Sequence, residues 1–164
     1  MPAPEASGLA VLRLKLSDFR GYADTRIEVD RRSVVLTGSN GAGKTNVLEA
    51  LSMLAPGRGL RRARLSDLDR QGGGAWAIAA RLQRGAEEPV EVGTGRDPEG
   101  GDKRVVRIDA KPVRGQAQLA EIVRWLGAHV PNAYGADDGL LRHVSKSFVD
   151  IIVDAFLNAY CLPD

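Results

Sequence analysis

Apolar and polar residues alternate along short stretches of the N-terminal part of the chain. Residues 9–16 read LAVLRLKL, and a second alternation follows at residues 25–29, after the turn-like string SDFRGY. Strict alternation is typical of strands with one buried face, so we expect an antiparallel pair here. A third run, residues 33–37 (SVVLT), is short, β-branched and bounded by turn residues. That pattern predicts a buried central strand.

The pattern then changes to a helical period. In residues 45–55 (TNVLEALSMLA) the apolar side chains recur at three- and four-residue spacing, and a Pro-Gly pair follows. This predicts a helix that ends near that pair. After a basic, polar segment at residues 58–71 we expect three strands and two helices, at residues 76–82, 89–92, 104–108, 116–125 and 140–160.

Composition excludes several classes of protein. The 164 residues, with 43% apolar and 27% charged, suit one domain or one lobe of a larger protein. The single Cys161 excludes an internal disulfide, and the two histidines lie in unrelated contexts that suggest no metal or triad site. No apolar run approaches the roughly 20 residues of a membrane span, and the first residues lack a secretory pattern. We therefore expect a cytoplasmic protein without a membrane partner.

The strongest chemical signal is the string GSNGAGKT, which directly follows the predicted strand and opens the predicted helix. It fits the G-x-x-x-x-G-K-[ST] template of a phosphate-binding Walker A loop at each fixed position: Gly38, Ser39, Asn40, Gly41, Ala42, Gly43, Lys44 and Thr45. A glycine-rich turn can mimic this string by chance, but the strand before it and the helix after it favour the nucleotide site.

Each part of the loop has a chemical reason. The glycines let the backbone wrap so that successive N–H groups point inward, and the helix start adds the positive end of its dipole. Lys44 is expected to reach the β- and γ-phosphates, and the Thr45 hydroxyl to ligate Mg²⁺. The sequence thus predicts a site for a nucleoside triphosphate with Mg²⁺, with ATP the expected cofactor.

The residues around the loop narrow the class. The strings DFRGY, GSNGAGKTNVLEAL, APGRGLRRARLSDLDRQG and DPEGGDKRVVRIDAKPVRGQAQLAEIV together resemble the RecF family, DNA replication and repair proteins related to SMC ATPases. The resemblance covers about residues 9–123. It implies an α/β fold: a P-loop NTPase, the N-terminal lobe of an ABC-type ATPase head, with a mixed sheet and an antiparallel β-subdomain. We expect this lobe at residues 1–125 and a divergent tail at residues 126–164.

The resemblance also implies roles for single residues. Arg20 of DFRGY matches a family residue near the nucleotide, although an arginine in a turn can equally be solvated. Asn46 could offer its backbone N–H to the α-phosphate. Phe19 and Tyr22 are expected to pack rather than touch nucleotide. DNA contacts are expected from a basic cluster that could as well be a solvated face: Arg58, Arg61, Arg62 and Arg64.

The later family motifs are missing from the sequence. No Leu-Ser-Gly-Gly signature occurs, and Ile151, Ile152 and Val153 before Asp154 only imitate a Walker B strand, because Ala155 stands where a catalytic carboxylate belongs. We name no catalytic residue. Whether the chain is an enzyme stays open, and we expect a truncated form that binds ATP but hydrolyses it poorly.

By resemblance the function is RecF-like: binding of ATP and of single-stranded or gapped DNA in recombinational repair, replication and the SOS response to DNA damage. The implied partners are DNA, a second copy of the full-length protein and other recombination mediators. Two alternatives stay open, an inert remnant of a P-loop ATPase and a P-loop kinase or GTPase. The second would need a lid rich in arginine or an Asn-Lys-x-Asp motif, and neither is present.

Overall fold

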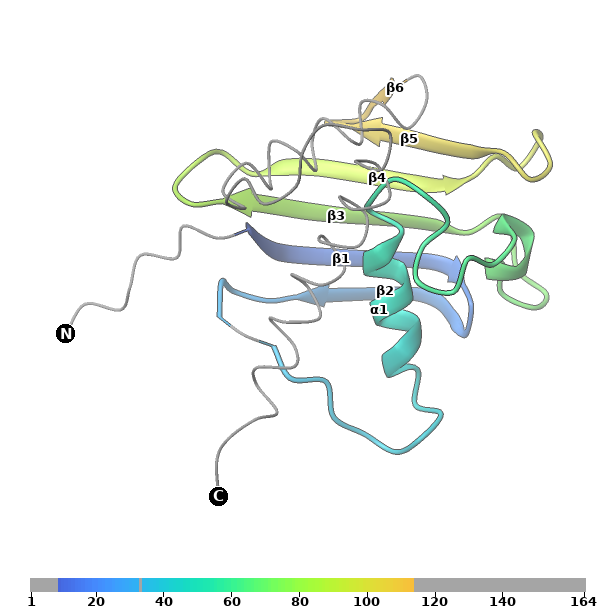
Figure 1. The fold of residues 1–164 in the computed structure, drawn as a ribbon, viewed down its shortest axis with the longest axis horizontal. Coiled ribbons are helices and arrows are strands. Elements are labelled where there is room, and N and C mark those ends of the chain that lie inside the picture. Colours follow the sequence, from blue (N-terminus) through green and yellow to red (C-terminus); the bar gives the residue numbers. More distant parts are fainter. Residues whose placement is uncertain (1–8, 33, 114–164) are drawn as a thin grey trace, which may run out of the picture.

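A computed structural model describes residues 9–32 and 34–113 of the chain. These residues form strands, one α-helix and one short 3₁₀-helix (Figure 1). In chain order the elements are β1 (Leu9–Phe19), β2 (Tyr22–Glu28), α1 (Lys44–Ser52), the 3₁₀-helix η1 (Leu65–Leu68), β3 (Ala77–Arg84), β4 (Val90–Arg96), β5 (Arg104–Ile108) and β6 (Lys111–Val113).

The strands form one sheet in the order β2-β1-β3-β4-β5-β6, and each neighbouring pair described is antiparallel. All pairs except β1–β3 are consecutive in the chain. Between β2 and β3 the chain leaves the sheet, forms the glycine loop and α1, and returns beside β1 (Figure 1). The predicted nucleotide loop therefore lies in the one long excursion between described strands.

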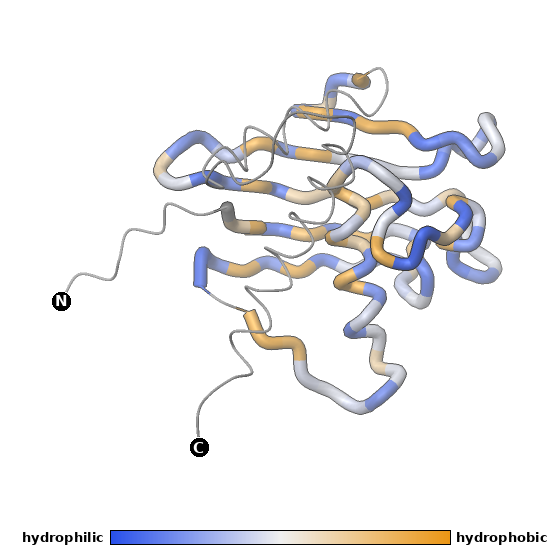
Figure 2. The backbone as a smooth tube through the Cα atoms, in the orientation of Figure 1, coloured by the Kyte–Doolittle hydropathy of each residue, from blue (hydrophilic) through white to orange (hydrophobic). Residues whose placement is uncertain are grey.

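Alternation along the strands decides which face of the sheet is buried. The register places Leu14 opposite Ala80 and Leu16 opposite Ile78, so the apolar members of these pairs share one face. Figure 2 shows the resulting succession of hydrophobic and hydrophilic positions along the strands. The apolar face is the one that α1 covers, and α1 runs across the strands rather than along them (Figure 1).

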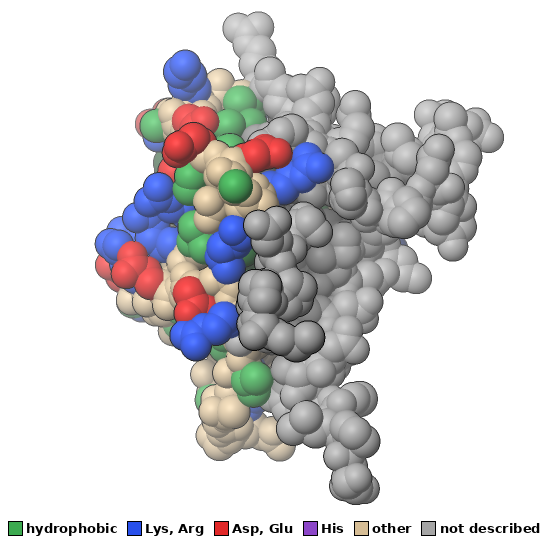
Figure 3. All heavy atoms as spheres, turned by 90° about the vertical axis from the view of Figure 1, so that its left-hand side faces the viewer, with side chains coloured by type: hydrophobic (Ala, Val, Ile, Leu, Met, Phe, Trp, Pro, Cys, Tyr) green, Lys and Arg blue, Asp and Glu red, His purple; other side chains and the backbone are tan. Residues whose placement is uncertain are grey.

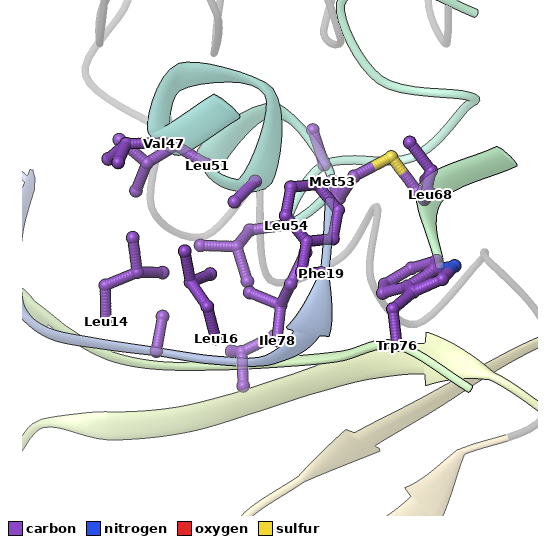
Figure 4. Packing of buried hydrophobic residues seen from close by; sticks show 14 of the residues in the cluster. Leu14, Leu16, Phe19, Val47, Leu51, Met53, Leu54, Leu68, Trp76 and Ile78 are labelled. Atoms are coloured by element: carbon purple, nitrogen blue, oxygen red, sulfur yellow. The ribbon is translucent and has the colours of Figure 1, made fainter. Parts of the chain in front are cut away.

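The core lies between α1 and this face of the sheet. Val47 and Leu51 of α1 lie above Leu14 and Leu16 of β1, and further residues close the core at the end of the helix (Figure 4). Fully buried there are Phe19, Met53, Leu68 and Trp76. The rings of Phe19 and Trp76 meet edge to face, with centroids 5.8 Å apart and an interplanar angle of 77°.

Most predicted elements are confirmed within one to four residues at their ends. The antiparallel pair is β1 and β2, the helix begins at Lys44 and ends at Ser52, and the three later strands are β3, β4 and β5. The predicted packing role of Phe19 and Tyr22 is also confirmed, since Phe19 is fully buried and Tyr22 is partly buried against the core. The short strand β6 was not predicted, because Lys111–Val113 offers too few residues for a readable alternation.

The predicted central strand at residues 33–37 is wrong for the described residues 34–37, which belong to no strand. Val35 has 48% of its surface exposed, which a central strand would bury. A β-branched run is prone to extend, but it becomes a strand only when a neighbour accepts its backbone hydrogen bonds. None of the described strands pairs with this segment, and the described sheet contains no parallel pair.

Several predictions fall outside the described residues. These are the helices at 116–125 and 140–160, the boundary near residue 125 and the tail at 126–164. Among the described residues, no helix is long and apolar enough to cross a membrane.

Candidate nucleotide-binding site

The glycine loop joins the extended segment 34–37 to α1, and three of its glycines have positive φ. These are Gly38 (140°), Gly41 (86°) and Gly43 (95°). A side chain is strained in such backbone, so the template's glycines and Gly41 have a direct conformational reason here. At Gly43 space is lacking as well, since an added Cβ would lie 2.5 Å from the Tyr22 hydroxyl. The loop is exposed, which leaves it accessible to a ligand.

Lys44 folds back over the loop. Its ammonium donates hydrogen bonds to the carbonyl of Gly38 at 2.6 Å and to that of Ser39 at 2.8 Å. These bonds hold the positive charge of Lys44 beside Gly38 and Ser39, at the beginning of the loop. An ammonium has three donor hydrogens, so a contact with a phosphate oxygen is compatible with both of these bonds.

The start of α1 is open to an anion. Gly43 is the N-cap residue, and no side chain caps the helix. The first N–H groups of a helix have no intrahelical partner, so those of Lys44 and Thr45 suit an anionic ligand. The N–H of Asn46, predicted to face the α-phosphate, here donates to the Gly43 carbonyl at 2.8 Å. In this conformation that donor already has a partner within the chain.

Arg20 lies in the turn between β1 and β2, and its guanidinium is paired with the chain itself. Nε and Nη2 donate to the two carboxylate oxygens of Glu49 at 3.0 and 2.8 Å, and Nη1 donates to the Asp67 carbonyl at 2.8 Å. The bond to Glu49 raises the pKa of Arg20 above its ordinary value. Arg20 therefore holds α1 and the segment at Asp67 in this conformation, and its contact with nucleotide stays a prediction.

Glu49 is a site residue that the sequence reading missed. Its side chain is 2% exposed, yet it carries a carboxylate that Arg20 contacts on both oxygens and that Arg61 approaches at 3.6 Å. A buried carboxylate is costly unless it is paired in this way. The helical pattern places Glu49 off the apolar stripe of α1, so the sequence alone indicates a solvated position.

Of the four arginines in the predicted basic cluster, one contacts Glu49 and three do not. All four arginines are exposed, but Arg61 is turned to Glu49, whereas Arg58, Arg62 and Arg64 have no such partner among the described contacts. The segment is docked on α1, since the N–H of Leu60 donates to the Ser52 hydroxyl at 2.8 Å. The cluster thus lies beside the nucleotide loop's own helix.

Arg104, the first residue of β5, binds the backbone at and just beyond the C-terminal end of α1. Its Nε donates to the Thr94 hydroxyl at 2.7 Å. Nη1 donates to the carbonyls of Ala55 and Gly57 at 3.2 and 2.9 Å, and Nη2 donates to those of Met53 and Ala55. Loss of water around the guanidinium lowers its pKa to about 10, so it stays charged at neutral pH.

On the opposite face of the sheet from α1 is a hollow of about 460 Å³. The small residues Ala77 and Ala79 of β3 and Gly93 and Gly95 of β4 line it. Lys15 of β1 and Arg107 of β5 border it as cations. None of residues 38–46 borders this hollow. The described residues also contain no group of three His, Cys, Asp or Glu side chains placed to hold a metal ion. The loop and the start of α1 therefore carry the candidate chemistry.

Comparison with known proteins agrees with this geometry. The AAA domain family matches residues 13–128, which is more than half of the chain. DNA replication and repair protein RecF from Caulobacter vibrioides is 47% identical over 124 residues, covering 71% of this chain and 32% of that protein. The RecF protein of Rhizobium etli is 43% identical over 152 residues, covering 88% and 38%.

Solved structures show the same fold at low identity. A structure of the recombination mediator protein RecF with ATPrS has a TM-score of 0.62 at 17% identity, over 70% of this chain and 30% of that one. An SMC ATPase structure, described in terms of ATP-driven dimerization, has a TM-score of 0.61 at 19% identity, over 88% and 98%. The α/β P-loop NTPase fold is thereby confirmed, although all strand pairs of the described sheet are antiparallel where a mixed sheet was expected.

The chain spans about a third of the length of the curated relatives it matches. By the family match over residues 13–128 and the RecF relatives found along most of its length, the chain belongs to the AAA domain family and resembles RecF within it.

Proposed function

We propose that the chain binds ATP with Mg²⁺ through residues 38–45 as part of a RecF-like protein of DNA replication and repair. The observation that supports this most is the geometry where the glycine loop leads into the first turn of α1. Glycines with positive φ lead into an uncapped helix start, and the Lys44 ammonium lies over the loop. Backbone N–H groups, helix dipole and one cation thus converge on a space suited to a polyphosphate.

The roles proposed for the single residues follow from their places. Residues 38–43 wrap the phosphates with their backbone, Lys44 contacts the β- and γ-phosphates, and the Thr45 hydroxyl ligates Mg²⁺. Thr45 is exposed in the first turn of α1, where a metal ion beside the phosphates would lie within reach. Asn46 and Arg20 complete the proposed nucleotide-contacting set, each after exchanging a present partner for phosphate.

Contact with single-stranded or gapped DNA is proposed for the basic cluster of Arg58, Arg61, Arg62 and Arg64. The three others are favoured, because Arg61 is engaged by Glu49 whereas they have no carboxylate partner within residues 9–32 and 34–113. Charge elsewhere is mixed: on the face seen in Figure 3, basic and acidic side chains alternate over the described part. Such mixing gives no reason to place a polyanion there.

For the whole protein we propose an ATP-dependent dimer in the cytoplasm that works with other recombination mediators in repair and the SOS response. The curated RecF relatives support this reading. The sequence given supplies the cradle, Lys44 and one proposed Mg²⁺ ligand. Since no residue in it matches a Walker B carboxylate, we expect nucleotide binding with negligible turnover.

Lys44→Ala tests the nucleotide site. Isothermal titration with Mg-ATP should show binding to the unaltered chain and at least a tenfold weaker binding to the variant, about 1.4 kcal/mol. Saturating Mg-ATP at 100 times Kd should also stabilise the unaltered chain by about 2.7 kcal/mol in thermal melts, and the variant much less. Lys103→Ala is the matched control, because Lys103 is an exposed lysine outside the loop.

Equal affinity in the Lys44→Ala variant would remove the proposed site. No binding and no thermal shift in the unaltered chain would favour the second candidate, an inert remnant of a P-loop ATPase. Segment 34–37 belongs to no described strand and leaves Val35 half exposed, and this observation keeps the second candidate in the test.

A further inference from the structure

The segment from Arg20 to Tyr22 contacts Glu49 of α1 and its N-cap Gly43, and between these two contacts Gly21 lies close to Asn46. Arg20 pairs with Glu49, and a Cβ on Gly21 would lie 4.0 Å from the Asn46 amide nitrogen. Tyr22 donates from its hydroxyl to the Gly43 carbonyl at 3.2 Å. Positions 43, 46 and 49 lie along one face of a helix, so the turn docks on that face in antiparallel order.

The contact at Tyr22 is the one that reaches the glycine loop. Gly43 is both the last loop glycine and the N-cap of α1, and its φ of 95° marks the corner between the two. A Cβ there would lie 2.5 Å from the Tyr22 hydroxyl and 3.1 Å from its ring carbon. The ring is partly buried and packs against the core, so it forms a fixed wall behind this corner.

The hydroxyl acts on a single peptide plane. The carbonyl of Gly43 and the N–H of Lys44 belong to one planar trans peptide and point in opposite directions. A donor that holds the carbonyl therefore sets the direction of the N–H, which is among the helix-start donors available to an anion. The same plane fixes the base from which the Lys44 side chain leaves.

We propose that Tyr22 is a positioning residue of the triphosphate site: its hydroxyl holds the Gly43–Lys44 peptide so that the Lys44 N–H and side chain are aimed at phosphate. This inference rests on the proposed nucleotide function. It assigns the effect to the hydroxyl and to the phosphate part of the ligand. The aromatic ring is a wall of the loop and has no part in recognising the base.

Tyr22→Phe tests the inference because it removes the hydroxyl and keeps the ring. Isothermal titration is done with two probes, Mg-ATP and Mg-tripolyphosphate, the second having no base or ribose. Loss of one hydrogen bond to a carbonyl predicts an affinity about three- to tenfold lower for both probes, with the same factor for each. Melting temperatures without ligand are measured on the same samples.

Ser52→Ala is the matched control. Ser52 lies in the C-terminal half of α1, and its buried hydroxyl accepts from the N–H of Leu60 at 2.8 Å and donates to the Glu49 carbonyl at 2.6 Å. This variant loses hydrogen bonds on the same helix and should melt at a lower temperature. Its affinity for both probes should equal that of the unaltered chain.

Three results would overturn the assignment of Tyr22. They are unchanged affinity in Tyr22→Phe, a loss for Mg-ATP but not for Mg-tripolyphosphate, and an equal loss in Ser52→Ala, which would reflect general loosening of the helix. If the unaltered chain bound neither probe, the proposed function itself would fail. That outcome is distinct from binding that is insensitive to the hydroxyl.

Discussion

At its C-terminal end α1 is held by a guanidinium and by buried side chains, whereas its N-terminal end is held by two polar contacts to an exposed loop. Arg104 donates to the carbonyls of three residues there, and Met53 and Leu54 are buried beneath them. At the other end the Lys44 ammonium and the Tyr22 hydroxyl supplement the helix's own backbone bonds to the Gly43 carbonyl, and no side chain caps the helix.

This difference shows how a short helix can present free donors without fraying. Carbonyls at the C-terminal end of a helix favour a cation, and Arg104 of β5 supplies one to the carbonyls of the C-cap Met53 and of Ala55 and Gly57 just beyond it. The first N–H groups favour an anion, and the chain supplies no acidic residue in the first turn. The contacts that hold α1 are concentrated at one end, and the donors proposed to bind phosphate lie at the other.

The largest loss of stability is expected from Arg104→Met. This substitution keeps a long side chain but leaves the carbonyls at the C-terminal end of α1 without their donor. We expect a loss of about 3 kcal/mol of unfolding free energy, since several charge-assisted bonds disappear together. For a chain of this size that is a fall in melting temperature of about 10 °C, measured by calorimetry.

Arg107→Met is the control for that variant. Arg107 lies three residues further on the same strand, with its side chain exposed, so its loss should change the melting temperature little. If the two variants melted alike, the C-terminal end of α1 would not be the anchored one. The contrast between the two ends would then be lost.

A smaller effect is expected from Glu49→Gln, in the middle of the helix. The amide keeps the shape but removes the charge that Arg20 and Arg61 share, which should cost about 2 kcal/mol. The measurement is the urea midpoint, compared with Glu88→Gln, which removes a charge at an exposed position of the β3–β4 turn. A shift no larger than that of the control would show that the buried pair adds nothing to the hold on α1.

The sequence predicted strands β1 to β5 of the sheet correctly but predicted a strand at residues 34–37 that the structure does not contain, and the reason is physical. Alternation in β1 and β3 encodes a buried and an exposed face, and the register confirms it at Leu14 and Leu16. Residues 34–37 encode only a tendency to extend. Pairing depends on a neighbour, which a local pattern does not contain.

The residues of the candidate site also differ in whether a local sequence pattern could predict them. The bend of the glycine loop could be predicted because its glycines serve a local backbone geometry, seen in the positive φ of Gly38, Gly41 and Gly43. Its contacts with nucleotide stay a prediction. Glu49 and Arg104 could not, because their burial comes from segments distant in sequence. The Arg20 turn and the basic segment cover Glu49, and the end of α1 covers Arg104.

The smallest change in stability is expected when the pH is lowered and Asp18, beside the turn that contacts α1, becomes protonated. Asp18 precedes that turn and accepts hydrogen bonds from the N–H of Gly74 at 3.1 Å and from the Arg70 guanidinium at 2.8 Å. Both bonds, that of Gly74 foremost, hold the pKa of Asp18 below its ordinary value of 3.8. The folded state therefore binds the proton less readily than the unfolded chain.

It follows that the contribution of Asp18 is present above about pH 4 and disappears as the pH falls through the lowered pKa of the folded state. Asp18→Asn should thus be slightly less stable than the unaltered chain at pH 7, and the difference should shrink toward pH 2. Urea titrations at several pH values measure it, with the exposed Glu87→Gln as control. A difference that stayed constant down to pH 2 would mean that the carboxylate charge has no part in fixing the turn. The support of the loop end of α1 would then rest on Arg20 and Tyr22 alone.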